Sequence, residues 1–312
     1  EPRQIIIGAG TEYLYGLIIQ LLGHNKIYAL EDPGYKKLFD VYKSNNAECV
    51  HISLDRKGVS IKEIKEKNAD VVHISPSHHF PTGIVMPVDR RYELLKWVAE
   101  CSNRYIIEDD YDSEFRFTGK PVPALFGNDV HGKVIYMNTF TKSLASTIRI
   151  SYMVLPEVLT DKFYKQLGFY SCTVSNFEQY TLAEFIHKGY FEKHINRMRN
   201  YYRKERDILI DCIKKSPLSD ISVIKEEDSG LHFLLCIDSE EDDFTLIKKA
   251  DDCGIRISCL SQYYFNKSEA PKSTIIINYS GIYEENIQEA VNRLSDIFDR
   301  GSIKKNKYQF IV

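Results

Sequence analysis

The chain has 312 residues, 43% of them hydrophobic, and a formal net charge of −3. This length suggests two domains with sizeable cores, and the near-neutral charge provides no broad basic surface for nucleic acid. The 7 cysteines are scattered without a CxxC pair, which favours reduced thiols in the cytoplasm over a disulfide framework or a zinc site.

Apolar, β-branched runs alternate with helical patterns through the first half of the chain. Most runs are continuous rather than alternating in polarity, as is typical of parallel strands covered on both faces. Strands are predicted at residues 4–8, 27–31, 48–52, 70–75, 104–109, 133–138 and 148–155. Helices are predicted at residues 11–22, 35–43, 60–67 and 89–101. This βαβ series predicts an α/β domain with a mainly parallel seven-stranded sheet covered by helices.

After Pro156 the pattern changes to longer helices followed by short strands. The predicted helices are residues 158–167, 177–215 with an interruption near Gly189, 244–252 and 284–299. The predicted strands are residues 221–225, 231–237, 255–260 and 274–280. We therefore expect a large domain at residues 1–189 and a smaller α+β domain at residues 190–312.

The stretch TFTKSLASTIRISYMVLP, residues 139–156, places a lysine just after a predicted buried strand. Strand ends in α/β sheets face the ligand crevice, so Lys142 is placed for chemistry. Thr139 and Thr141 supply hydroxyl groups, and Arg149 supplies a planar fork that suits a phosphate. A lysine beside a phosphate site suggests a Schiff base with pyridoxal 5'-phosphate (PLP). A plain surface lysine is the alternative.

A Schiff base with PLP also requires an acid that pairs with the pyridine nitrogen. The stretch YIIEDDYDSEF, residues 105–115, ends another predicted strand with four carboxylates. A carboxylate there would keep the pyridine protonated and hence an electron sink. A divalent-metal site is the alternative, but no histidine or second acid cluster completes it, so we predict no metal.

Two further stretches suit a phosphate and a ring. GAGTEY, residues 8–13, lies between a strand and a helix, so its backbone N–H groups face a bound anion. Tyr13 stands where a dinucleotide fingerprint would have its third glycine, so NAD is disfavoured. Tyr35 in EDPGY, residues 31–35, follows a strand and a turn and is either a ring platform or a core residue.

Together these motifs resemble the fold-type-I PLP-dependent aminotransferase class I/II family. The chain is most similar to the aminotransferase-like effector domain of MocR-type GntR transcription regulators, which include a γ-aminobutyrate sensor. The motifs that carry this resemblance are EDPGY (31–35), HISPSHHFPTG (73–83), IIEDDYDSEF (106–115) and TFTKSLASTIRISYMVLP (139–156). Weaker similarity continues through residues 184–202 and 229–233, so the resemblance covers nearly the whole chain.

The resemblance implies roles for individual residues. Lys142 would form the internal aldimine, Asp109 would pair with the pyridine nitrogen, and Tyr111 would lie near the phenolic oxygen. His78 or His79 would be a polar partner of that oxygen, with a structural role as the alternative. The remaining implied contacts are Tyr35 on the ring and, around the phosphate, Gly10, Thr11, Thr139, Thr141 and Arg149.

The chain departs from the family pattern at the substrate carboxylate. Related chains carry an arginine on the late strand, whereas IIINYSG, residues 275–281, offers Ser280 and Gly281. Lys37 is a possible substitute, but its ammonium group lacks the bidentate fork of arginine. The resemblance therefore implies a small-molecule effector or an amino-group substrate without identifying it.

Three function classes remain open. The chain is the ligand-sensing domain of a MocR-type regulator with at most partial transaminase chemistry, a free-standing aminotransferase, or a PLP-free α/β binding module. As a regulator domain it would form a homodimer and reach DNA only through an N-terminal winged-helix domain. The abrupt start of the sequence suggests a fragment that lacks such a domain. No apolar run approaches the roughly 20 residues that cross a bilayer, so no membrane partner is predicted.

Overall fold

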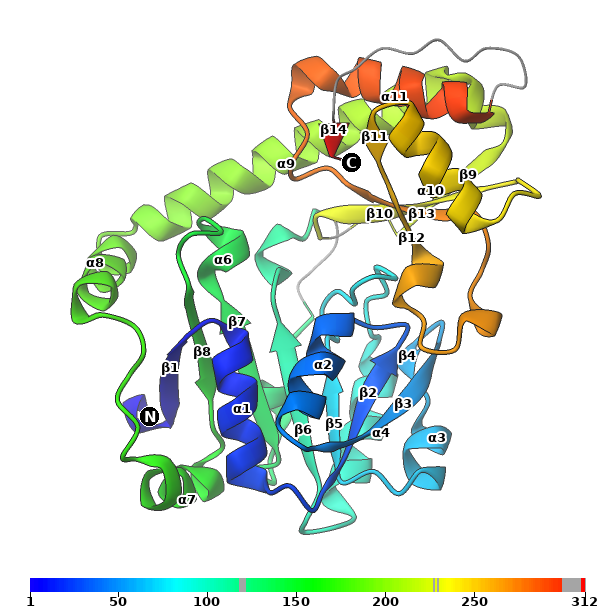
Figure 1. Ribbon diagram of the computed structural model, residues 1–312. Helices are drawn as coiled ribbons and strands as arrows, with labels where there is room; N and C mark the ends of the chain where they lie inside the picture. Colours follow the sequence, from blue (N-terminus) through cyan, green and yellow to red (C-terminus); the bar gives the residue numbers. More distant parts are fainter. Residues whose placement is uncertain (118–121, 227, 229, 299–309, 312) are drawn as a thin grey trace. The chain divides into compact units, whose positions relative to one another are not determined.

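The computed structural model describes residues 1–117, 122–226, 228, 230–298 and 310–311. The chain separates into two compact units (Figure 1). Unit 1 comprises Glu1–Phe80, Ile84–Ser113 and Lys120–Lys193. Unit 2 comprises Pro81–Gly83, Glu114–Gly119 and His194–Val312. Two short mid-chain segments thus belong to unit 2, and the domain boundary expected at residue 190 stays a prediction.

Unit 1 contains an eight-stranded sheet in the order β1-β8-β7-β6-β5-β2-β3-β4. Its strands are β1 (Ile5–Ala9), β2 (Ile27–Asp32), β3 (Glu48–Asp55), β4 (Gly58–Val59), β5 (Val71–Ile74), β6 (Tyr105–Asp110), β7 (Val134–Thr139) and β8 (Ile150–Val154). The pairings from β7 through β6, β5 and β2 to β3 are parallel. The three outer pairings, β1 with β8, β8 with β7, and β3 with β4, are antiparallel. The predicted mainly parallel sheet is confirmed, and β4 is an additional strand of two residues.

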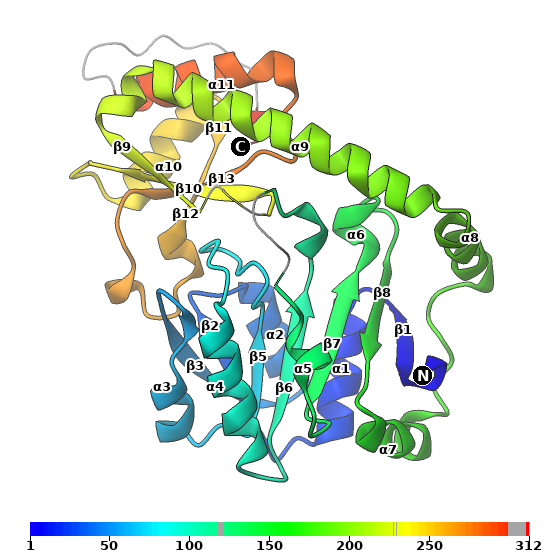
Figure 2. The ribbon, with the colours of Figure 1, turned by 180° about the vertical axis from the view of Figure 1, so that it is seen from behind.

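Helices cover both faces of this sheet (Figures 1 and 2). The α-helices of unit 1 are α1 (Thr11–Leu22), α2 (Lys36–Ser44), α3 (Ile61–Glu66), α4 (Val88–Ala99), α5 (Leu125–Asn128), α6 (Phe140–Ser143), α7 (Glu157–Leu167) and α8 (Asn176–His187). Figure 1 shows α1 and α2 in front of the sheet, and Figure 2 shows α4 and α5 on the other face. The short 3-10 helices are η1 (Pro2–Gln4) and η2 (Ser113–Phe115), whose last two residues belong to unit 2.

The two layers of helices explain why the central strands of the sheet are mostly apolar. Successive side chains of a strand point to opposite faces of a sheet. Ile106 of β6 accordingly packs in a buried cluster with Trp97 of α4, whereas Ile107 packs in another with Leu14 of α1. Both isoleucines are fully buried, so a polar residue at either position would lose its hydration.

Unit 2 is an α+β unit around the four-stranded antiparallel sheet β12-β13-β10-β9. Its strands are β9 (Ser222–Lys225), β10 (His232–Ile237), β11 (Ile255–Arg256), β12 (Ser258–Cys259), β13 (Thr274–Asn278) and β14 (Phe310–Ile311), the last paired in parallel with β11. Its helices are α9 (Tyr190–Lys215), which begins in unit 1, α10 (Asp243–Asp252), α11 (Glu284–Phe298), η3 (Pro217–Asp220), η4 (Leu260–Tyr263) and η5 (Lys267–Glu269). One buried cluster joins Leu209 of α9, Phe233 of β10 and Leu294 of α11. The strand predicted at 255–260 is divided, because β11 and β12 pair in different sheets.

Candidate functional site

Most residues predicted from the motifs lie at one edge of the unit 1 sheet, where β2, β5, β6 and β7 end and α1 begins (Figure 1). The chain continues from β2 to β3 on one side and then returns to β5, β6 and β7 on the other. Ligands of open α/β sheets bind outside the strand ends at such a reversal of strand order. The sheet topology alone therefore marks this edge as a ligand site.

Asp109, near the end of β6, is held by buried polar side chains. Its Oδ2 atom accepts a hydrogen bond from the Tyr15 hydroxyl at 2.5 Å and lies 3.5 Å from His73 Nε2. Burial, with the Asp109 charge, raises the pKa of Tyr15 well above its usual range, so Tyr15 remains a donor. The other oxygen, Oδ1, is buried and has no hydrogen-bond partner among the described residues. Such an oxygen is costly unless a ligand donates to it.

Tyr111 and His78 lie in a second buried polar group. His78 Nδ1 lies 2.8 Å from Asp112 Oδ2 and 3.1 Å from the Tyr111 hydroxyl. Burial, reinforced by the charges of Asp112 and Asp109, raises the pKa of Tyr111 well above its usual range. Tyr111 is therefore a neutral hydroxyl group that can donate or accept a hydrogen bond.

His79, the second candidate histidine, is directed toward a different carboxyl group. Its Nε2 atom lies 3.4 Å from Glu31 Oε2, which also accepts the Ser75 backbone N–H at 2.9 Å. Burial lowers the pKa of His79 to about 3 and raises the pKa of Glu31 to about 8. At neutral pH His79 is therefore neutral and Glu31 is mostly protonated, so this pair contributes little charge to the site.

The predicted phosphate cup is built from Gly10, Thr11 and Arg149. Gly10 has φ +95°, which L side chains rarely adopt, and a Cβ atom there would lie 2.5 Å from Arg149 Nη2, so a larger residue would be strained and would displace the guanidinium. Arg149 Nη2 lies 2.9 Å from Glu12 Oε2, and Lys37 Nζ donates to Glu12 Oε1. Thr11 begins α1, one turn before Tyr15. Lys37 is thus already paired with a carboxylate.

Lys142 lies in α6, directly after β7. Its side chain is exposed and forms no hydrogen bond or ion pair with any residue that the structure describes. The Thr139 hydroxyl caps α6 by accepting the Thr141 N–H at 3.2 Å, and it also accepts the Ser151 hydroxyl at 2.9 Å. Thr139 therefore orients the short helix that carries Lys142, and its expected phosphate contact stays a prediction.

The other carboxylates of the EDDYD run face separate partners. Glu108 accepts two backbone N–H groups at the start of α5, and Asp110 accepts the Tyr136 hydroxyl at 2.8 Å. Asp112 contacts His78. Within the described parts of the chain, no three His, Cys, Asp or Glu side chains form a group that could hold a metal.

The residues considered for the ring and the carboxylate clamp lie in different units. Tyr35 precedes α2 in unit 1, is 50% exposed and makes an edge-on contact with Phe80. Ser280 and Gly281 follow β13 in unit 2. The Ser280 hydroxyl and N–H both donate to Asn278 Oδ1, so this serine is held in a local turn.

Sequence reasoning missed three side chains of this site: Glu12, Tyr15 and His73. Tyr15 follows Thr11 by four residues and therefore shares its helix face, which was a usable signal. His73 interrupts the apolar run of β5, and a polar residue in a doubly covered strand needs a partner. Glu12 is an acid in the first turn of a helix that was expected to bind an anion, and that conflict was visible in GAGTEY.

Comparison with known proteins gives consistent matches. The model of the aminotransferase class I and II family matches residues 1–294. The HTH-type transcriptional regulator YdeL of Bacillus subtilis is 42% identical over 94% of this chain and 62% of its own length. The probable rhizopine catabolism regulatory protein MocR of Rhizobium meliloti is 32% identical over 95% of this chain and 60% of its own length. The chain thus spans less than two thirds of either regulator.

Solved structures define the class of the fold. The kynurenine aminotransferase of Pyrococcus horikoshii is 26% identical, with a TM-score of 0.80 over 94% of this chain and 74% of that enzyme. An archaeal alanine:glyoxylate aminotransferase has a TM-score of 0.82 over 96% of this chain and 75% of its own. The fold is that of the fold-type-I PLP-dependent aminotransferases, as the sequence predicted. With its family model matched over nearly its whole length, the chain belongs to the aminotransferase class I and II family.

Proposed function

We propose that this chain is the PLP-binding, ligand-sensing domain of a MocR-type transcription regulator. The observation that carries the cofactor assignment is the buried Asp109 Oδ1 atom, which lacks a partner among the described residues beside the end of a parallel strand. The regulator assignment rests on the 42% and 32% identity to the two regulators. DNA binding would belong to a separate N-terminal domain of the whole protein.

The residues of unit 1 suit this cofactor. When bound, PLP supplies an electron sink for chemistry at an amino-bearing carbon. Lys142 would hold it through a Schiff base, and Asp109 would accept the hydrogen bond of its protonated pyridine nitrogen. Tyr111 and His78 would hydrogen-bond the phenolic oxygen. His79 would be a neutral partner behind these two residues. We assign Tyr35 to the ring and Gly10, Thr11, Thr141 and Arg149 to the phosphate. Thr139 would contribute to the phosphate site through its cap of α6.

The regulator assignment is tested by turnover and by the coding sequence upstream. We expect the whole gene product to begin with a DNA-binding domain and to complete few, if any, transamination cycles. Single-turnover spectra and multiple-turnover assays with amino donors and 2-oxo acids would separate the two cases. Sustained turnover, or an upstream sequence without a DNA-binding domain, would instead favour a free-standing aminotransferase. The similarity to the kynurenine aminotransferase is the observation that supports this second candidate function.

The ligand is expected to lack a lone carboxylate as its anchoring group. The late strand has no arginine, and Lys37 is paired with Glu12. Charge-assisted hydrogen bonds contribute roughly 1.5–3 kcal/mol each, so simple α- and γ-amino acids should bind weakly. Amines with another distal group, or PLP and related vitamers themselves, are the proposed effectors. Spectral titration with a panel of amines and amino acids checks this. A response to alanine or γ-aminobutyrate at micromolar concentration would show that another residue binds the carboxylate.

We also propose that the protein is cytoplasmic. All 7 cysteines are free thiols, in keeping with a reducing compartment.

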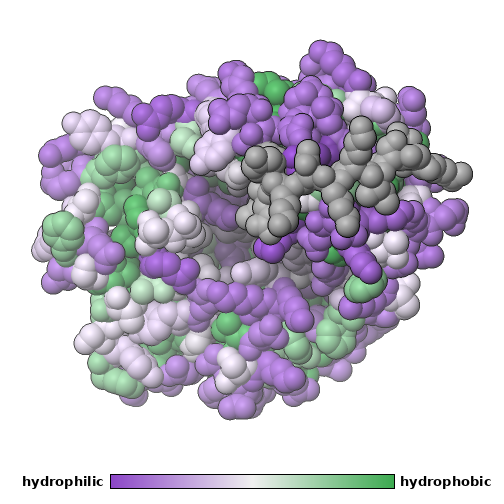
Figure 3. Space-filling model, turned by 45° about the horizontal axis from the view of Figure 1, so that its top comes forward, coloured by the Kyte–Doolittle hydropathy of each residue, from purple (hydrophilic) through white to green (hydrophobic). Residues whose placement is uncertain are grey.

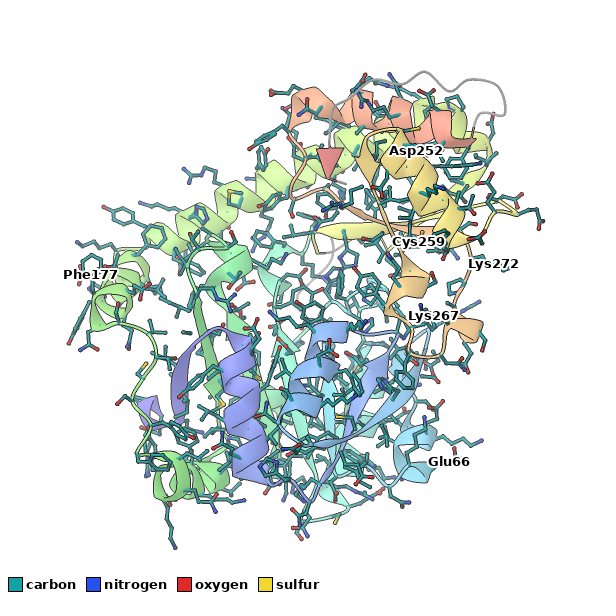
Figure 4. All side chains as sticks on the ribbon, in the orientation of Figure 1. Glu66, Phe177, Asp252, Cys259, Lys267 and Lys272 are labelled. Atoms are coloured by element: carbon teal, nitrogen blue, oxygen red, sulfur yellow. The ribbon has the colours of Figure 1, made fainter. Side chains whose placement is uncertain are left out.

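The protein is further proposed to be a homodimer that uses the face of α8. Among the described residues, α8 has no buried side chain, and Phe177 and Tyr180 are 80% and 74% exposed. Phe177 on α8 points outward in Figure 4, and Figure 3 shows hydrophobic residues gathered at the left of the view, the side on which Figure 1 draws α8. Contiguous exposed apolar surface of this kind marks interfaces, and a second copy would cover it. No described helix could span a membrane.

Replacing both Phe177 and Tyr180 by serine is expected to weaken dimerisation at least about tenfold, because each aromatic side chain buries a large apolar area. Analytical ultracentrifugation over a concentration series measures the effect. Phe244→Ser is the matched control, since Phe244 is 79% exposed but lies on α10 in unit 2. An unchanged dimer constant in the double variant would place the interface elsewhere.

A further inference from the structure

The carboxylate of Glu12 lies inside the predicted phosphate cup, at the start of α1. A Cβ atom on Gly10 would be 2.8 Å from Glu12 Oε2 and 2.5 Å from Arg149 Nη2, so both groups lie directly over residue 10. Each carboxylate oxygen binds one cation, Oε2 the guanidinium of Arg149 and Oε1 the ammonium of Lys37. Glu12 is the second residue of α1, so its carboxylate lies at a helix N-terminus, where first-turn N–H groups favour anions.

Glu12 is ionised in this position at neutral pH. Partial burial opposes its charge, but hydrogen bonds from Lys37 and its own N–H, with the charge of Arg149, hold the pKa of Glu12 below its usual value. The hydrogen bond that Lys37 donates to Glu12, reinforced by the charge of Glu12, raises the pKa of Lys37. A carboxylate here thus pairs with two cations at a helix N-terminus, which is the setting expected of a bound phosphate. The Glu12 and Arg149 side chains are 29% and 52% exposed, so the carboxylate can be displaced without unpacking a core.

We propose that Glu12 is an internal competitor for the phosphate of the cofactor, so that binding exchanges a carboxylate for a phosphate at Arg149. This inference rests on the proposed PLP function. Two cations and one carboxylate leave a single positive charge in the cup, whereas removing the carboxylate would leave two. Glu12 therefore lowers the affinity of the cup for any phosphate dianion. The site then fills only at higher cofactor concentrations. The exchange also releases Lys37 from its partner.

The test is the affinity of the cofactor-free protein for PLP, measured by absorbance titration, in wild type and in Glu12→Gln. We expect about tenfold tighter PLP binding in the variant, because a dianion loses one nearby like charge. Pyridoxal, which lacks the phosphate, should bind equally to both proteins. Glu66→Gln is the control. Glu66 is exposed on α3, a helix that contributes no residue to the cup, and it points into solvent (Figure 4).

A second variant and a second probe keep the outcomes distinct. Glu12→Ala removes the charge without an amide and should act in the same direction as Glu12→Gln. Inorganic phosphate should raise the melting temperature of both variants more than that of wild type, because a ligand stabilises the folded state in proportion to its affinity. Equal or weaker binding of PLP and phosphate in both variants would overturn the inference, since Glu12 would then orient Arg149 instead. If no protein reacts with PLP but phosphate still discriminates the variants, the cofactor assignment fails while the competition at the cup stands.

Discussion

Replacing Lys142 by alanine is expected to abolish the absorption band of protein-linked PLP. Among the candidate residues Lys142 alone supplies a primary amine at the end of a sheet strand, and no described side chain pairs with it. Because the side chain is exposed, its removal should change folding stability by no more than about 0.5 kcal/mol. The loss would therefore report covalent attachment rather than unfolding. Absorbance spectra before and after borohydride reduction, followed by peptide mass spectrometry, measure it.

The control for this experiment is Lys165→Ala, which removes another exposed lysine of unit 1, on α7. That variant should keep the band, and borohydride should still fix the cofactor on Lys142. A band that persists in Lys142→Ala, with the label on a different lysine, would contradict the assignment. Weak, non-covalent retention of PLP by Lys142→Ala is compatible with it, because the phosphate cup and Asp109 remain.

The central strands of unit 1 could be predicted because burial on both faces makes most of their positions apolar. In β6, Ile106 and Ile107 face different helix layers, and the run ends where the acids begin. β4 has two residues, which is too short for any pattern. The break between β11 and β12 depends on the pairing of β11 with residues 310–311, a contact between distant parts of the chain that no local pattern encodes.

Part of the candidate site was visible in the same way. Lys142 and Asp109 are polar residues at the ends of apolar strands, so their place at the edge of the sheet follows from the pattern. The partners of these groups do not follow from it. The hydroxyl of Tyr15 reaches Asp109 across 94 residues of sequence, and Glu12 reaches Arg149 across 137. Such pairs depend on how α1 packs against the sheet, which no local sequence pattern specifies.

Replacing Asp109 by asparagine is expected to weaken PLP binding strongly while the fold is retained. Removing one partner of a buried charge pair costs on the order of 3–5 kcal/mol, which corresponds to roughly a hundredfold to several thousandfold in affinity. The structure also indicates how the amide would be oriented. Tyr15 donates to Oδ2, so the amide oxygen would occupy that position and the NH₂ group would replace Oδ1. An N–H donor facing the pyridine nitrogen stabilises its unprotonated form, so the electron sink would be lost as well.

Two measurements on Asp109→Asn separate these effects. Equilibrium dialysis gives the affinity for PLP, and the ¹⁵N chemical shift of bound, labelled PLP reports whether the pyridine nitrogen is protonated. Asp110→Asn is the matched control, because Asp110 is also buried, accepts a tyrosine hydroxyl and has one oxygen without a hydrogen-bond partner among the described residues. As the next residue of β6, however, it points to the opposite face of the sheet. That control should keep a protonated pyridine even if it loses some stability. Wild-type affinity together with a protonated nitrogen in Asp109→Asn would show that the free Oδ1 atom of Asp109 does not serve the cofactor, and the site would have to be rebuilt around another acid.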